Sequence, residues 1–260
     1  LHILPGVIDS QVHFREPGLE HKEDIAHGTK SAIKGGVTSI FEMPNTSPLT
    51  LDEQTLQDKL SRAEKTAWCD YAFFMGGNSE NAHRLSYLER LPGCAGVKIF
   101  MGSSTGTLLA KDDEVIADVL ANGVRRVSVH AEDEDRLISR QNIAIESESP
   151  QAHPDWRDVE SAVRATTRLV KLAREANRRV HVLHISSKDE MDILAKHKDL
   201  ISVEVTLNHL TLNAPDCYEQ LGAFAQMNPP VRDLIHQTGL WAAIQNGIVD
   251  VIGSDHAPHT

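Results

Sequence analysis

Residues 180–190 (VHVLHISSKDE) contain the unit from which the rest of the chain is built. The run 180–184, rich in β-branched and apolar side chains, predicts a short buried strand. Ser187 follows, with Glu190 three residues later, and this spacing is the capping box that satisfies free amides at the start of a helix. The stretch therefore predicts a strand that leads directly into a helix.

Similar strand-forming runs occur along the whole chain, at 6–9, 37–43, 71–75, 97–100, 126–130, 202–206 and 249–254. Amphipathic stretches separate them, and one begins at a second capping-box pattern, Thr50 with Glu53. Strands that alternate with helices pair in parallel, because a parallel partner is reached only through a crossover. Eight such units in about 250 residues predict an α/β fold, a (β/α)8 TIM-type barrel, rather than an open doubly wound sheet.

We expect one barrel domain over residues 1–260, because the sequence contains no linker or low-complexity tract. No helical pattern follows the last strand run at 249–254, and strand-forming residues stand at the very start of the chain. We therefore interpret the sequence as a fragment of a longer chain that lacks its last helix.

The charge and cysteine content exclude several classes of protein. The chain has 26 Lys and Arg against 37 Asp and Glu, a net charge of −11, which disfavours nucleic-acid binding. Three widely spaced cysteines indicate neither a disulfide framework nor a thiolate zinc site. No apolar run is long enough to cross a membrane. We expect a cytoplasmic homo-oligomer of two or more chains that acts on a small molecule.

Reactive side chains should collect at the carboxyl ends of the strands, where barrel enzymes carry their active sites. Alternation along the first strand puts Gln11, His13 and Arg15 on one side. In the fourth strand the same alternation points Lys98 into the barrel. A buried, unpaired ammonium tends to lose its proton, and the neutral amine can add carbon dioxide to form a carbamate that bridges two cations. An ion-paired interior lysine is the alternative.

The fifth, sixth and eighth strands end in His130, His184 and Asp255. Neutral imidazole and carboxylate oxygen are the usual protein ligands of zinc, so these residues predict a metal centre with His13 and Lys98. A metal there would activate water and polarise a carbonyl oxygen. Asp255 could then take the proton of the water and pass it to a leaving nitrogen. The pattern predicts metal-assisted hydrolysis of an amide-type bond.

Four further residues are candidates for binding the substrate. Arg15 and His259 offer cationic or donor groups for a carboxylate, which Arg can bind through two hydrogen bonds. Asn45 and Asn228 could hydrogen-bond an amide, although both also suit turns. The remaining histidines are interpreted as structural or surface residues, and His181 is expected to point away from the site.

Six motifs together resemble the dihydroorotases of the amidohydrolase superfamily. In chain order they are VHFREPG (12–18), MPNT (43–46), VKIFM (97–101), HAED (130–133), NPP (228–230) and DHAPH (255–259). The resemblance covers essentially the whole chain. It implies the reversible interconversion of N-carbamoyl-L-aspartate and L-dihydroorotate in pyrimidine biosynthesis, and a small flanking β domain that this sequence lacks.

The resemblance also implies roles for individual residues. The zinc ligands, for one or two ions, would be His13, a carboxylated Lys98, His130, His184 and Asp255. The substrate would be bound by Arg15, Asn45, Asn228 and His259, with Asp255 also acting as base and acid.

The chain departs from the family pattern at Gln11, where the family usually has the first His of a His-x-His pair. A Gln carbonyl oxygen is a weaker ligand than imidazole and prefers harder cations. Three interpretations stay open. The site holds one metal firmly and a second loosely, or Gln11 ligates through its oxygen, or the protein is a homologue that has lost activity.

Three alternatives to a dihydroorotase remain. The same scaffold could hydrolyse a hydantoin, dihydropyrimidine or allantoin ring, none of which carries the carboxylate of dihydroorotate. Residues 102–106 (GSSTG) match the G-x-S-x-G motif of a nucleophile elbow, with Ser104 as the nucleophile. That elbow needs a strand that turns directly into a helix, and no helix pattern follows directly here. The barrel could also be a catalytically inactive binding subunit.

Overall fold

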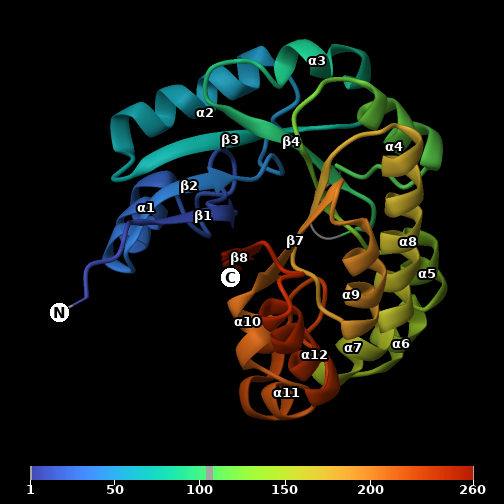
Figure 1. Cartoon of the computed structure of the whole chain (residues 1–260). Helices are drawn as coiled ribbons and strands as arrows, with labels where there is room; N and C mark the ends of the chain where they lie inside the picture. The colour runs from blue at the N-terminus through green and yellow to red at the C-terminus, as the bar shows by residue number, and fades with distance from the viewer. Residues whose placement is uncertain (1, 104–107, 260) are drawn as a thin grey trace.

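The computed structural model describes residues 2–103 and 108–259, which form a ring of eight parallel strands with helices on its outer side (Figure 1). Each strand pairs with the next one along the chain, in the order β1 to β8. The strands are β1 (Val7–Val12), β2 (Val37–Glu42), β3 (Asp70–Gly76), β4 (Cys94–Phe100), β5 (Val127–His130), β6 (Val180–Val182), β7 (Ile201–Thr206) and β8 (Val251–Gly253). The predicted (β/α)8 barrel is confirmed.

Helices occupy the connections between the strands. They are α1 (Ile25–Lys34), α2 (Glu53–Thr66), α3 (Leu85–Leu88), α4 (Asp113–Ala121), α5 (Glu134–Ser139), α6 (Gln141–Glu146), α7 (His153–Trp156), α8 (Val159–Glu175), α9 (Lys188–Leu194), α10 (Leu207–Thr211), α11 (Asp216–Leu221) and α12 (Leu234–Gln245). No helix in the described ranges is long and apolar enough to cross a membrane. The expected location and homo-oligomeric assembly stay predictions.

Contacts between the end of β1 and the segment just after β8 close the ring. Val12 forms an isolated parallel bridge with His256, and the amide of His13 donates to the carbonyl oxygen of His256 at 2.7 Å. These contacts lie at the carboxyl ends of the two strands. The closure therefore brings the first and last motifs of the chain to the same rim.

The alternation along β4 separates the apolar layer from the barrel interior. Val97 and Ile99 are completely buried in the main apolar cluster, which includes Ile116 and Val119 of α4. Lys98 between them is also completely buried, but on the opposite face. Val97 and Ile99 pack against the helices on the outer face, which stabilises β4 and makes the Lys98 amine point into the barrel.

One predicted helix cap is correct and the other is wrong. The Ser187 hydroxyl accepts the amide of Glu190 and begins α9, as predicted. At α2, the cap is Asp52 rather than Thr50, because the carboxylate of Asp52 accepts the amide of Thr55 at 2.8 Å. The amide of Thr50 instead bonds to a loop carbonyl group before the helix. An ionised carboxylate is the stronger acceptor at a helix N-terminus, where the dipole favours negative charge.

Candidate active site

Lys98 lies in the barrel interior with its Nζ atom 4.4 Å from the centroid of the Phe100 ring. Within the described residues this amine has no hydrogen-bond partner. Burial lowers the pKa of Lys98 to about 7, although the charges of Asp255 and Glu204 oppose the shift. An amine in this state loses its proton near neutral pH and becomes nucleophilic.

Lys98 stands among the three predicted imidazole ligands. Burial lowers the pKa of His13, His130 and His184, and the charge of Lys98 contributes to all three shifts. The imidazoles are therefore neutral near pH 7, which is the form that can bind a metal. Side chains from β4 and from the ends of β1, β5 and β6 thus converge at one end of the barrel.

Gln11 and His13 both contact a single oxygen atom of Asp255. The Nε2 atom of Gln11 donates to Asp255 Oδ1 at 3.0 Å, and His13 Nε2 lies 3.3 Å from the same oxygen. On the other side of its ring, His13 Nδ1 donates to Asn45 Oδ1 at 2.8 Å. With its proton on Nδ1, neutral His13 directs the lone pair of Nε2 at a carboxylate. The His13 lone pair and the Asp255 oxygen repel each other, so this arrangement favours a cation bound between them.

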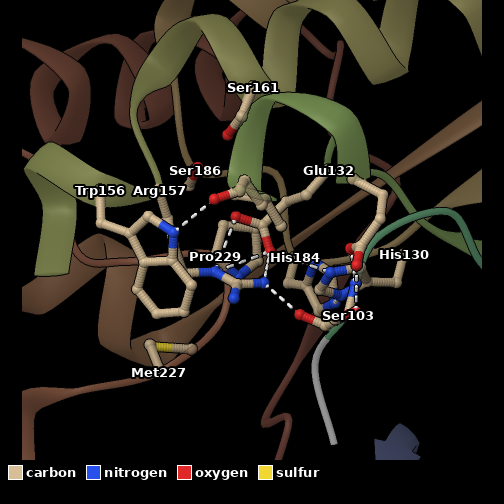
Figure 2. A network of polar contacts seen from close by, with 12 residues as sticks. Ser103, His130, Glu132, Trp156, Arg157, Ser161, His184, Ser186, Met227 and Pro229 are labelled. Carbon is tan, nitrogen blue, oxygen red and sulfur yellow. Dashed lines mark hydrogen bonds and ion pairs between the residues drawn. The ribbon is translucent and has the colours of Figure 1, made fainter. Parts of the chain in front are cut away.

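His130 and His184 form a second pair. His130 Nδ1 lies 3.0 Å from His184 Nε2, and the ring centroids are 4.7 Å apart. Behind His130, the carboxylate of Glu132 accepts a hydrogen bond from Nε2 at 3.0 Å (Figure 2). His184 Nδ1 is buried and has no partner within the described parts of the chain.

Three of the predicted site residues adopt a left-handed backbone conformation. Arg15 has φ +67°, His184 has φ +39° and Asp255 has φ +50°. Each such conformation costs on the order of 1–3 kcal/mol in a non-glycine residue, and strain of this kind is concentrated at functional sites. All three residues follow strand ends, so the strain lies at the same rim of the barrel.

Arg15 and His259 lie side by side at the proposed substrate end. Arg15 Nη2 is 3.1 Å from His259 Nε2, and Arg15 Nε donates to the carbonyl oxygen of Pro258 at 3.0 Å. Asn45 joins the site through His13, as described above. Asn228 is not part of these contacts, and its Oδ1 atom is buried without a hydrogen-bond partner in the described residues.

Sequence reasoning missed three buried polar residues around the site: Glu132, Arg157 and Glu204. Glu132 carried a usable signal, because it stands two residues after His130 in the motif HAED. Glu204 did as well, being the one charged residue inside the apolar run of β7. Arg157 lies between two helices, where alternation predicts nothing.

The expectation for His181 is wrong. Its ring is buried and contacts Ser202 Oγ at 2.7 Å and Glu204 Oε2 at 3.3 Å, within a polar layer that includes the carboxylate acting on Lys98. The expectation extended the alternation of β6 as far as His184. However, β6 ends at Val182, and the left-handed backbone at His184 breaks that alternation.

The alternative with a serine nucleophile in residues 102–106 is not tested by the structure. Ser104 lies outside the described residues, and neighbouring Ser103 donates its hydroxyl to Glu134 at 2.6 Å.

Within the described residues, no group of three or more His, Cys, Asp or Glu side chains is gathered to hold a metal ion. Two pairs are present instead, His13 with Asp255 and His130 with His184. The metal centre therefore stays a prediction.

Known proteins match this chain in both sequence and structure. The dihydroorotases of Thermococcus kodakarensis and Halobacterium salinarum are 35% and 33% identical over 99% of this chain, which covers 57% and 60% of those proteins. An allantoinase of Solibacter usitatus is 34% identical over 99% of this chain and 58% of its own length. The chain thus spans somewhat more than half the length of the curated relatives it matches.

Solved structures of cyclic amidohydrolases superpose closely. The L-hydantoinase from Arthrobacter aurescens has a TM-score of 0.90 at 27% identity, covering 98% of this chain and 58% of that one. The dihydropyrimidinase from Brevibacillus agri has a TM-score of 0.88 at 28% identity, covering 99% and 59%. The profile of the amidohydrolase family matches residues 2–260. A match over nearly the whole length, on the barrel described above, shows that this chain belongs to the amidohydrolase family.

Proposed function

We propose that the protein is a metal-dependent hydrolase of cyclic amides, and specifically a dihydroorotase that interconverts N-carbamoyl-L-aspartate and L-dihydroorotate in pyrimidine biosynthesis. Several of the curated relatives are named dihydroorotase. The observation that carries the choice of substrate is the pairing of Arg15 with His259 at 3.1 Å, close to Asp255. Dihydroorotate has a carboxylate for these donors to bind, whereas hydantoin, dihydrouracil and allantoin rings do not.

The side chains present fit a zinc ion. Lys98 Nζ, His184 Nδ1 and Gln11 Oε1 are among the buried polar atoms that have no hydrogen-bond partner in the described residues. Buried polar atoms are normally satisfied, so unsatisfied ones that gather at one place support a ligand there. The residues that would hold zinc are His13, Lys98 as its carbamate, His130, His184 and Asp255, with Gln11 as a weaker oxygen ligand. Bound zinc supplies Lewis acidity, which polarises the ring carbonyl and makes water more acidic.

Asp255 moves the proton in this proposal. Gln11 Nε2 donates to Oδ1 of this carboxylate and His13 Nε2 lies 3.3 Å from the same oxygen, so neither contact involves the second oxygen. In the hydrolytic direction the carboxylate accepts a proton from the attacking water and returns it to the ring nitrogen as the amide bond breaks. In the reverse direction the same group removes the proton of the ureido nitrogen. One residue therefore serves both directions.

The first test compares substrates and an Arg15→Met variant of the natural protein. We expect turnover of dihydroorotate to exceed that of hydantoin, dihydrouracil and allantoin. Loss of a charge-assisted hydrogen bond costs about 1.5–3 kcal/mol, so Arg15→Met should raise KM for dihydroorotate about 10- to 100-fold. The matched control is Arg62→Met, which replaces a partly exposed arginine on α2. An unchanged KM, or faster turnover of an uncharged ring, would support the hydantoinase or allantoinase alternative instead.

The second test concerns Gln11. Replacing it by His restores an imidazole next to Asp255, and imidazole is the better zinc ligand. We expect Gln11→His to bind a second zinc ion more tightly than the natural protein does, measured by competition with a chromogenic chelator. Equal zinc stoichiometry and affinity in both proteins would contradict the assignment of Gln11 to the metal site. Absence of both zinc and turnover in the natural protein would favour the inactive binding subunit.

A further inference from the structure

A buried carboxylate stands behind His130, on the side away from His184. Glu132 is completely buried, and its Oε2 atom accepts a hydrogen bond from His130 Nε2 at 3.0 Å (Figure 2). Arg157, between α7 and α8, donates from Nε to both oxygens of Glu132 at 3.2 Å and from Nη2 to Oε2 at 2.5 Å. A buried carboxylate held in this way by a guanidinium group stays ionised. It can only accept hydrogen bonds.

This contact determines where His130 carries its proton. A neutral imidazole has one N–H group, and the contact with an ionised carboxylate places that group on Nε2. Nδ1 then carries a lone pair, and Nδ1 is the atom that lies 3.0 Å from His184 Nε2. The hydrogen bond from Nε2 to Glu132 thus leaves Nδ1 as the nitrogen that can bind a metal ion.

We infer that the Glu132–Arg157 pair is a positioning device, which holds His130 as the Nε2–H tautomer and directs the Nδ1 lone pair toward a metal ion shared with His184. The inference rests on the proposed metal-dependent function and deepens it. Glu132 and Arg157 are positioning residues, because they act through His130 and contact no reacting atom. Carboxylate partners of metal-bound histidines commonly fix the tautomer and the orientation of the ring.

The surroundings hold the pair in place. Arg157 Nη2 also donates to the carbonyl oxygen of Ser103 at 2.6 Å, which ties the turn after β4 to the end of β5. In the same turn Gly102 lies so close to Glu132 that an added Cβ atom would stand 2.7 Å from the Glu132 carbonyl oxygen. The Phe100 ring packs 5.9 Å from that of His130 and offers no acceptor of comparable strength. Removing Glu132 therefore takes away the acceptor that fixes Nε2–H.

The test replaces both members of the pair. Glu132→Met alone would leave Arg157 charged and buried, which is strongly destabilising, whereas replacing both partners by apolar groups is often tolerated. We therefore use E132M/R157M in the natural protein, with histidine-selective 15N labelling in the metal-free state. The His130 signals are assigned by comparison with His130→Asn. We expect Nε2–H in the wild type and a mixture with Nδ1–H in the double variant. The dissociation constant for zinc alone should rise about 10- to 100-fold.

The matched control is E89M/R178M. Glu89 and Arg178 form another buried pair, with Nη2 3.0 Å from Oε2, near the opposite ends of the strands. We expect this variant to keep the wild-type tautomer and zinc affinity. The inference is overturned if wild-type His130 is mainly Nδ1–H, or if either readout is unchanged in E132M/R157M. The tautomer is read without metal or substrate, so the result is independent of whether the protein hydrolyses a cyclic amide.

Discussion

At the scale of single residues, burial sets the charge states of this site. Taking a charged group out of water disfavours the charged form, and this lowers the pKa of His13, His130, His184 and Lys98. A protonated imidazole or ammonium has no lone pair, so a ligand role requires the neutral forms. The buried surroundings therefore make these basic side chains available as ligands near neutral pH.

His209 shows the same effect outside the predicted ligand set. Burial lowers its pKa from 6.5 to about 4, partly opposed by a hydrogen bond to the Pro229 carbonyl oxygen. Because the pKa is lower in the folded protein, the unfolded chain binds the proton more readily. The contribution to stability is complete above pH 6.5 and is lost as the pH falls toward 4. A shift of this size corresponds to about 3 kcal/mol.

We expect His209→Gln to reduce the loss of stability between pH 6.5 and pH 4. The measurement is the free energy of unfolding in urea, without metal, at several pH values across this range. The control is His27→Gln, which replaces an exposed histidine of α1 and should change the pH dependence less than His209→Gln does. Equal pH dependence in the wild type and His209→Gln would contradict the prediction.

At the scale of elements, a buried ion pair connects α2 to the end of β2. Lys59 and Glu42 are both almost completely buried, and Lys59 Nζ also donates to the carbonyl oxygen of Met43 at 3.0 Å. Burial raises the pKa of Glu42 to about 7, although the charge of Lys59 opposes the shift. Met43 begins the loop that carries Asn45. The pair thus supports the strand end from which Asn45 reaches His13.

We expect Lys59→Met and Glu42→Gln each to destabilise the protein by about 3–5 kcal/mol, because each leaves one buried polar partner alone. The double variant should be no less stable than either single one. Urea unfolding of all three proteins forms a double-mutant cycle. Lys59→Met should also lower the free energy of unfolding by less at pH 5 than at pH 8, because Glu42 is neutral at pH 5 and no unpaired charge is left buried. Additive losses in the double variant would show that the pair does not act as a unit.

At the scale of the whole molecule, the ring of strands is least connected where it closes. β4 and β5 share four paired positions, whereas β1 is joined to the segment after β8 by the isolated bridge of Val12 with His256 and the hydrogen bond from His13 to His256. Local opening follows the regions with few buried backbone hydrogen bonds. The closure nevertheless carries His13 and Asp255, so the weakest seam of the barrel lies beside the proposed catalytic group.

We expect backbone amides of β1 and β8 to exchange with deuterium faster than those of β4 and β5. Hydrogen exchange followed by mass spectrometry on the natural protein reads all four strands in one experiment. Added zinc should slow exchange at the β1–β8 seam more than at β4 and β5, since ligands from both seam strands would be joined. Uniform protection of the four strands, with or without zinc, would contradict this view of the closure.

The sequence alone predicts the barrel class, the parallel pairing of the strands and the inward direction of Lys98. These follow from short-range properties: β-branched runs, period-two alternation and the parallel pairing that helical connections require. It also placed the candidate residues at the strand ends, because each motif directly follows its strand.

The contacts between distant side chains depend on the folded barrel. Gln11 and Asp255 are 244 positions apart, and closure of the ring brings them to 3.0 Å. Arg157 reaches Glu132 from a helix connection, and no local periodicity predicts that contact. At His184 the left-handed backbone ends the alternation, which is why His181 was assigned to the wrong side. Alternation and propensity act over a few residues, whereas these contacts depend on how the closed barrel positions distant chain segments.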